Sequence, residues 1–171
     1  PIKSSAASDV YKRQLFGILM VPVSYAFMRK ISRSTWIASF AALLIVFDFM
    51  HFTLSRIGTI DVIVGFFILL TFYLMYLVLD DLKMGCSWKT VCLMILNGMA
   101  AGAAMASKWT GVYACAGIAV LFFTFLFQEY GTAAARTRKG MSGQAAISYL
   151  AGLSVICIAA YILIPAVIYV C

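Results

Sequence analysis

The residues most suited to chemistry stand in a short polar stretch between two apolar runs, which holds Asp48, His51, Arg56 and Asp61. Asp48 and His51 are three residues apart, so on a helix they share one face, either as a structural pair or as functional groups. Arg56 and Asp61 are five residues apart, about 140° around a helix, and they meet only if the chain bends between them, which Gly58 allows. Acidic groups near membrane depth are costly and often functional, although Asp61 also suits the positive N-terminal end of a helix.

A second polar turn, Ser107-Lys-Trp-Thr-Gly111, lies about fifty residues further along the chain. Lys108 and Arg56 each have hydroxyl and aromatic neighbours, and two cations beside hydroxyls are able to hold a phosphate. The alternative interpretation is interfacial anchoring, because Trp and Lys favour the headgroup zone of a membrane. Trp109 fits both interpretations.

Metal and thiol chemistry have little support in the sequence. The five cysteines lie mostly in apolar stretches and none forms a CxxC pair, which favours small buried hydrophobic side chains over disulfides or metal ligands. No cluster has the spacing of metal ligands. The sequence therefore predicts no cofactor with certainty and leaves metal dependence open.

The composition excludes a soluble domain. Hydrophobic residues make up 64% of the chain and charged residues 11%, and the mean hydropathy is +1.02, against roughly one half apolar and one quarter charged in a globular domain. The formal net charge of +7 is interpreted as membrane topology, because basic residues gather in cytoplasmic loops. No basic-aromatic motif predicts a nucleic-acid partner.

The pattern predicts an all-α fold, a polytopic transmembrane bundle of five to six helical segments, because long apolar runs satisfy their backbone in lipid only as helices. Strands of a barrel would alternate apolar and polar residues, and these runs do not. Pro22 is expected to kink the first segment. A GxxxG motif at Gly98 and Gly102 predicts a close helix–helix seam. A polar loop is expected at residues 128–146. The expected apolar segments cover residues 15–28, 35–50, 60–79, 90–106, 112–127 and 147–171.

Both ends of the chain have unusual features. Residues 4–14 resemble a translated sequencing-library adaptor, so we expect residues 1–14 to be a non-native leader. The chain stops at Cys171 inside an apolar run. Residues 15–171 are then expected to form a partial transmembrane domain.

The basic residues predict an orientation, because alternate turns of a bundle lie on opposite sides. One set of turns holds only Arg56 and Lys108, and the asymmetry assigns that set to the extracytoplasmic side or a lumen. The other, cytoplasmic set holds eight cations: Arg29, Lys30, Arg33, Lys83, Lys89, Arg136, Arg138 and Lys139.

Two phrases carry a family resemblance that covers most of residues 15–130. The stretch Asp48-Phe-Met-His-Phe-Thr-Leu-Ser-Arg-Ile-Gly-Thr-Ile-Asp61 resembles the protein O-mannosyltransferase family, and Gly102-Ala-Ala-Met-Ala-Ser-Lys-Trp-Thr-Gly-Val-Tyr113 is similar to a second phrase of that family. The resemblance has a bacterial character. It implies a GT-C type glycosyltransferase in a bacterial plasma membrane.

The resemblance implies that mannose moves from a polyprenyl-phosphate carrier to Ser or Thr hydroxyls of an acceptor protein on the extracytoplasmic side. Arg56 and then Lys108 are the candidates for binding the lipid phosphate, with Asp61, Trp109, His51 and Asp48 in supporting roles. Asp61 would orient Arg56 or contact the sugar, and Trp109 would stack on sugar or isoprenoid. The family's acidic catalytic motif belongs to a loop before residue 15, so no general base is assigned and this polypeptide alone is expected to be inactive.

Three other hypotheses stay open. Another GT-C enzyme would modify a lipid or a cell-wall glycan instead of a protein. A multi-spanning transporter also carries intramembrane acids and Gly-rich spans, but here the polar residues gather at turns on one side and not along a midplane path. A structural membrane subunit has no specific feature in its favour, and the oligomeric state is not predicted.

Overall fold

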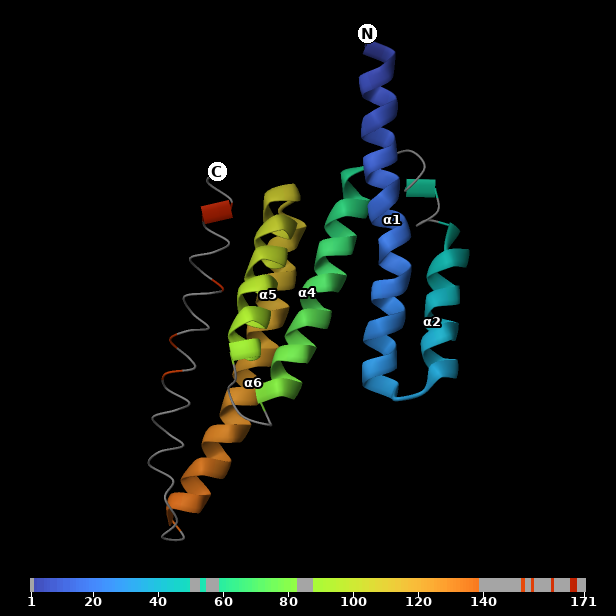
Figure 1. The fold of residues 1–171 in the computed structure, drawn as a ribbon. Helices are drawn as coiled ribbons and strands as arrows, with labels where there is room; N and C mark the ends of the chain where they lie inside the picture. The colour runs from blue at the N-terminus through green and yellow to red at the C-terminus, as the bar shows by residue number, and fades with distance from the viewer. Residues whose placement is uncertain are drawn as a thin grey trace.

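The chain is described by a computed structural model, which covers residues 2–49, 53–54, 59–82, 88–138, 152, 155, 161 and 167–168. Figure 1 shows long helices standing side by side, and the described residues contain no strand. The expected all-α fold is therefore confirmed. The α-helices are α1 (Ile2–Ser32), α2 (Thr35–Phe47), α4 (Ile60–Leu82), α5 (Trp88–Ser107) and α6 (Thr110–Arg138).

Four helical stretches in the described part of the chain are long and apolar enough to cross a membrane. They match four of the segments expected from hydropathy, and they make the chain a polytopic helical membrane protein. The helix α2 has 13 residues, about 20 Å at 1.5 Å per residue, which is short for a span. The four stretches are Gln14–Ser32, Ile60–Leu82, Trp88–Ser107 and Thr110–Glu129.

Two expected boundaries differ from the structure. The polar loop expected to begin at residue 128 is wrong for residues 128–138, because α6 continues to Arg138. Gln, Glu, Ala and Arg are good helix formers, so hydropathy marks the end of the apolar stretch and not the end of the helix. The second segment, expected to reach residue 50, ends as α2 at Phe47. The sixth expected segment, residues 147–171, lies almost entirely outside the described residues.

The helix α1 is longer than the first apolar run. It begins at Ile2 and continues through Pro22 to Ser32, where Arg33 takes a positive φ of 54°. A left-handed residue just after the last turn is a common way for a helix to end. Thr35 then starts α2, which packs on α1 and runs back beside it (Figure 1).

The helix α4 lies at the centre of the bundle and packs against α1, α5 and α6. On one side, aromatic pairs join it to α1, with the Phe16 ring tilted against Phe66 and Phe67 at centroid distances of 5.4 and 5.7 Å. On the other side, a buried hydrophobic core joins α4 to α5 and α6. That core consists of Met75, Val78, Leu82, Met94, Ile118, Phe122 and Leu126.

The predicted small-residue seam lies on the buried face of α5. Gly98, Ala101 and Gly102 are buried there, and α4 and α5 make the most extensive helix–helix contact in the described chain. Because small residues let two helix backbones approach closely, this pattern suits close packing of α5 against a neighbouring helix.

The turns lie alternately at the two ends of the bundle. At one end α1 finishes and α2 starts, and α4 finishes and α5 starts; α6 also runs toward that end, whereas α4 starts and α5 finishes at the other (Figure 1). Arg29, Lys30 and Lys89 therefore lie at the opposite end from Lys108. We call the end that holds Lys108 the α4-start end.

Candidate functional site

An ion pair joins the two polar phrases at the α4-start end. The ammonium of Lys108 lies 2.5 Å from the Oδ1 atom of Asp61 and donates a hydrogen bond to it. The two residues are 47 positions apart in sequence, and their side chains remain 48% and 46% exposed. The pair is therefore both a structural link and a charged surface that a ligand is able to reach.

Asp61 is placed by the start of α4. It stands in the first turn of that helix, where a carboxylate offsets the positive end of the helix dipole. The preceding Thr59 ties its backbone N–H and its hydroxyl to the carbonyl of Leu54, at 3.3 and 3.4 Å. The approach to the helix is thus held by local hydrogen bonds, which fixes the position of the carboxylate.

Lys108 is placed by a tight turn between α5 and α6. Its N–H bonds the carbonyl of Ala104 at 3.2 Å, which completes the last turn of α5. Its own carbonyl accepts the N–H of Gly111 at 2.9 Å, and the Trp109 carbonyl accepts the N–H of Val112 at 3.0 Å. Since both sides of Lys108 are bonded within the turn, its backbone has little freedom.

Gly111 is required by the close approach of the two helices. A Cβ at this position would lie 2.4 Å from the carbonyl carbon of Ala104, 2.6 Å from its oxygen and 2.5 Å from the backbone nitrogen of Met105. Real Cβ atoms essentially never come this near to backbone, so only glycine fits the turn. This role of Gly111, which stands in the second family phrase, was not predicted from the sequence. A Gly placed between two apolar runs was the available sign of it.

Trp109 and Tyr113 add aromatic surface close to Lys108 in the sequence. Their side chains are 75% and 79% exposed; Trp109 stands in the turn before α6 and Tyr113 in the first turn of that helix. Exposed aromatic rings at the end of a span suit the membrane interface and also suit stacking on a sugar or an isoprenoid. Tyr113 was not singled out from the sequence.

The other predicted site residues stand in the stretch of sequence that joins α2 to α4. Asp48 is exposed and stands at the end of α2, where its N–H bonds the carbonyl of Ile45 at 3.3 Å. His51 and Arg56 lie outside the described residues, so their part in the site stays a prediction. The expected partnership of Asp61 with Arg56 also stays a prediction. The Asp61–Lys108 pair was not predicted.

Metal ligands do not gather in the described part of the chain. Among those residues, no group of three or more His, Cys, Asp or Glu side chains is placed to hold a metal ion. Two cysteines described there are free thiols, Cys92 on the surface and Cys115 half-buried.

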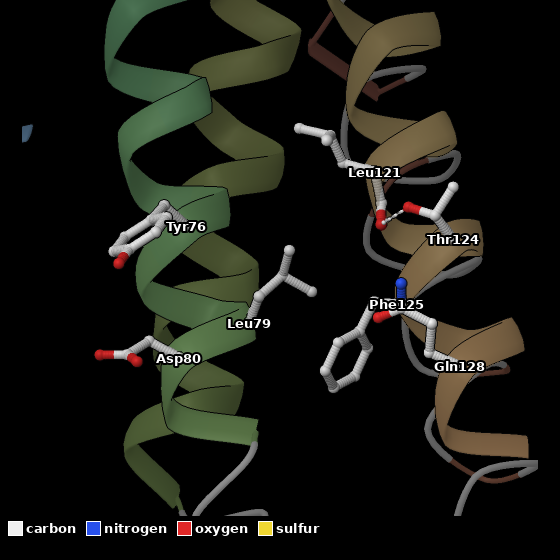
Figure 2. A pocket seen from close by; sticks show the side chains of 7 residues that line it. All are labelled: Tyr76, Leu79, Asp80, Leu121, Thr124, Phe125 and Gln128. Atoms are coloured by element: carbon white, nitrogen blue, oxygen red, sulfur yellow. Dashed lines mark hydrogen bonds between the residues drawn. The ribbon is translucent and has the colours of Figure 1, made fainter. Parts of the chain in front are cut away.

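An open groove between α4 and α6 lies away from the ion pair. It encloses about 230 Å³, and Figure 2 shows Leu79 and Phe125 pointing toward each other across it while Asp80 and Tyr76 point away from α6. The carboxylate of Asp80 pairs instead with Lys30 on α1, at 3.9 Å. The centre of this groove is thus apolar. Its lining consists of Tyr76, Leu79, Asp80, Leu121, Thr124, Phe125 and Gln128.

The fold and site together define a polytopic helical membrane protein with a charged, accessible site at one end of its bundle. Comparison with known proteins refines this class. Residues 13–171 match the sequence profile of the family described as dolichyl-phosphate-mannose-protein mannosyltransferase, and the chain belongs to that family. The resemblance carried by the two phrases is thereby confirmed.

A curated relative is similar along most of the chain. It is dolichyl-phosphate-mannose–protein mannosyltransferase 6 of Candida albicans, which is 26% identical over 163 residues. The match covers 91% of this chain and 20% of the relative, so the chain spans about a fifth of the length of that protein. No solved structure gives a significant match.

Proposed function

We propose that this chain contributes the donor-binding region of a membrane mannosyltransferase, which moves mannose from a polyprenyl-phosphate carrier to Ser or Thr hydroxyls of proteins. The observation that carries the proposal is the Lys108–Asp61 ion pair. It joins the two phrases that resemble the family, and membership of the family supports the type of reaction. The charge asymmetry between the two ends supports an extracytoplasmic site.

Lys108 acts on the phosphate of the donor. In the transfer, the bond between the anomeric carbon and the phosphate oxygen breaks, and its electron pair stays on the phosphate. A nearby cation stabilises the charge that develops there. The ammonium of Lys108 is accessible, and Asp61 fixes its position. Arg56 is the second candidate cation, because guanidinium pairs well with phosphate oxygens.

The acceptor hydroxyl attacks the opposite face of the anomeric carbon, which inverts its configuration. A carboxylate is expected to take the hydroxyl proton as general base. No acid is assigned to that role. Asp61 is engaged with Lys108, and Asp80 stands near the end of α4, away from the α4-start end.

The test compares two lysines of the full-length protein. Lys108→Gln should lower mannose transfer from the lipid donor to a Ser/Thr peptide by about 100-fold, the loss typical when one group that stabilises a developing oxyanion is removed. Lys89 is also exposed but lies at the other end of the bundle, so Lys89→Gln should leave transfer unchanged. Equal activity of both variants would exclude Lys108 from the reaction.

The same assay separates the protein acceptor from its alternatives. Transfer of mannose to a peptide supports protein mannosylation, whereas transfer only to lipid or glycan would assign the chain to another GT-C activity. Uptake of a solute without any transfer would favour a transporter. Arg56→Ala should reduce transfer as Lys108→Gln does, and unchanged donor affinity and turnover would remove Arg56 from the mechanism.

A further inference from the structure

The charges of the ion pair cancel each other at the place where an anion is proposed to bind. Lys108 contributes one positive charge and Asp61 one negative charge, with their charged atoms 2.5 Å apart. Both side chains are nearly half exposed, so an incoming phosphate meets the carboxylate as well as the ammonium. A site built only to maximise attraction for phosphate would not hold an acid at this position.

The candidate ligands differ in charge. A sugar linked through a phosphodiester carries one negative charge on its phosphate. A polyprenyl phosphate monoester carries about −1.5 to −2 at neutral pH, since its second pKa is about 6. A carrier linked through pyrophosphate also has more than one negative charge. A carboxylate beside the phosphate therefore repels the monoester and the pyrophosphate more strongly than the phosphodiester.

The reaction itself converts the ligand from a phosphodiester into a phosphate monoester. When the anomeric carbon–oxygen bond breaks, the phosphate keeps the electron pair and changes from a singly charged diester to a doubly charged monoester. The acceptor oxygen forms the new bond to carbon and releases its proton to a carboxylate base. The product thus carries more negative charge beside Asp61 than the donor did.

We infer that Asp61 determines donor specificity at this site: its carboxylate, held beside Lys108, selects a singly charged phosphodiester over doubly charged phosphates and promotes release of the polyprenyl phosphate product. The inference rests on the proposed function. It gives Asp61 two effects through one contact, because the residue positions the ammonium of Lys108 and also limits the charge that the site accepts.

The chain supplies a matched control for the electrostatic effect. Asp80 also pairs with a lysine, Lys30, and the two side chains are 49% and 52% exposed. This second pair lies toward the opposite end of the bundle, because Lys30 stands in the last turn of α1 and Asp80 close to the end of α4. Asp80→Asn removes the same charge from the protein as Asp61→Asn does, but away from the proposed phosphate.

The experiment measures binding of two ligands with the same isoprenoid chain to the full-length protein, at pH 8 and fixed ionic strength. One is the polyprenyl phosphate monoester and the other is its methyl phosphodiester. The wild type should bind the diester more tightly, relative to the monoester, than Asp61→Asn does. The ratio of the monoester Kd to the diester Kd should therefore fall by about tenfold in Asp61→Asn, as expected for one unit charge near a partly exposed site.

Two further variants separate charge from position. Asp61→Glu keeps the carboxylate and should preserve the wild-type ratio, and Asp80→Asn should preserve it as well. A ratio that does not move in Asp61→Asn, while both ligands weaken equally, would overturn the inference and leave Asp61 as a positioning residue only. A ratio that moves equally in Asp80→Asn would also overturn it, because the effect would then be one of overall charge.

Failure of the proposed function gives a different result. If Lys108→Gln binds both ligands as well as the wild type does, no phosphate site exists at Lys108 and both proposals fall. If Lys108→Gln weakens both ligands but Asp61→Asn leaves their ratio unchanged, the phosphate site stands and only the specificity inference falls.

Discussion

Thr90 donates a 2.6 Å hydrogen bond from its hydroxyl to the Oδ2 atom of Asp81. Thr90 is fully buried in the first turns of α5, and Asp81 stands in the last turn of α4. The bond therefore links the two helices at the end of the bundle opposite the Lys108–Asp61 pair. It also provides a polar partner for a carboxylate that is partly removed from water.

Thr90→Val keeps the shape of the side chain but removes the donor to Asp81. We expect it to lower the free energy of unfolding by about 1–3 kcal/mol, because a partly buried carboxylate loses a hydrogen bond. Thr124 is an exposed threonine whose hydroxyl bonds only the nearby Leu121 carbonyl among the described residues, so Thr124→Val should change stability by less than about 0.5 kcal/mol. Denaturant unfolding in detergent measures both, and equal effects would contradict the role given to Thr90.

Gly111→Ala should damage the site without touching a charged residue. The added Cβ has no room against the backbone of Ala104, so the α5–α6 turn must open, at a cost of roughly 1–3 kcal/mol. Because this turn fixes Lys108, affinity for the phosphate ligand should fall as well. Thermal unfolding and ligand binding measure the two effects.

Gly65→Ala is the matched control for this prediction. A Cβ at Gly65 meets only the methyl end of Met20, at an ordinary 3.8 Å, and Gly65 lies inside α4. Since alanine favours a helix over glycine by about 1 kcal/mol, this variant should be neutral or slightly stabilised. If Gly111→Ala behaved in the same way, the close approach at Ala104 would not limit the turn.

Asn97 should couple energetically to Tyr161. Asn97 is fully buried on α5, and its amide donates to the Tyr161 hydroxyl at 2.6 Å, which in turn donates to the sulfur of Met75 at 3.4 Å. A double-mutant cycle of Asn97→Ala and Tyr161→Phe should give a coupling energy of about 0.6 kcal/mol, typical of hydrogen bonds between membrane helices. Strictly additive effects on stability would exclude the contact.

The predicted orientation can be measured with two threonines at opposite ends. Thr35 and Thr110 are both exposed first residues of helices, α2 and α6. In a cysteine-free background, Thr110→Cys should react with an impermeant thiol reagent applied to intact cells, and Thr35→Cys only after permeabilisation. The reverse pattern would invert the topology and move the Lys108 end to the cytoplasm.

Hydropathy predicted the membrane spans because a bilayer requires long apolar helices, and the apolar character of each residue is read directly from the sequence. It placed α4 and α5 within a few residues of their observed bounds. It failed beyond residue 127, because the rest of α6 continues with good helix formers and not with apolar residues.

The site was predicted only in part. Alternation of the turns placed Asp61 and Lys108 at the same end, but it gave no distance between them. Their 2.5 Å contact depends on the height at which α4 and α5 pack against each other. Such a register is a property of two surfaces together, and a single sequence does not display it.

The helices α4 and α5 are linked by polar side-chain contacts near both of their ends, and they pack closely along the length between these contacts. Thr90 and Asp81 hold one end, and Lys108 and Asp61 hold the other. Links at both ends restrain the two helices relative to each other, so the ammonium and the carboxylate already lie together. A lipid phosphate that bound at the proposed site would therefore lose little free energy to rearranging the helices that hold it.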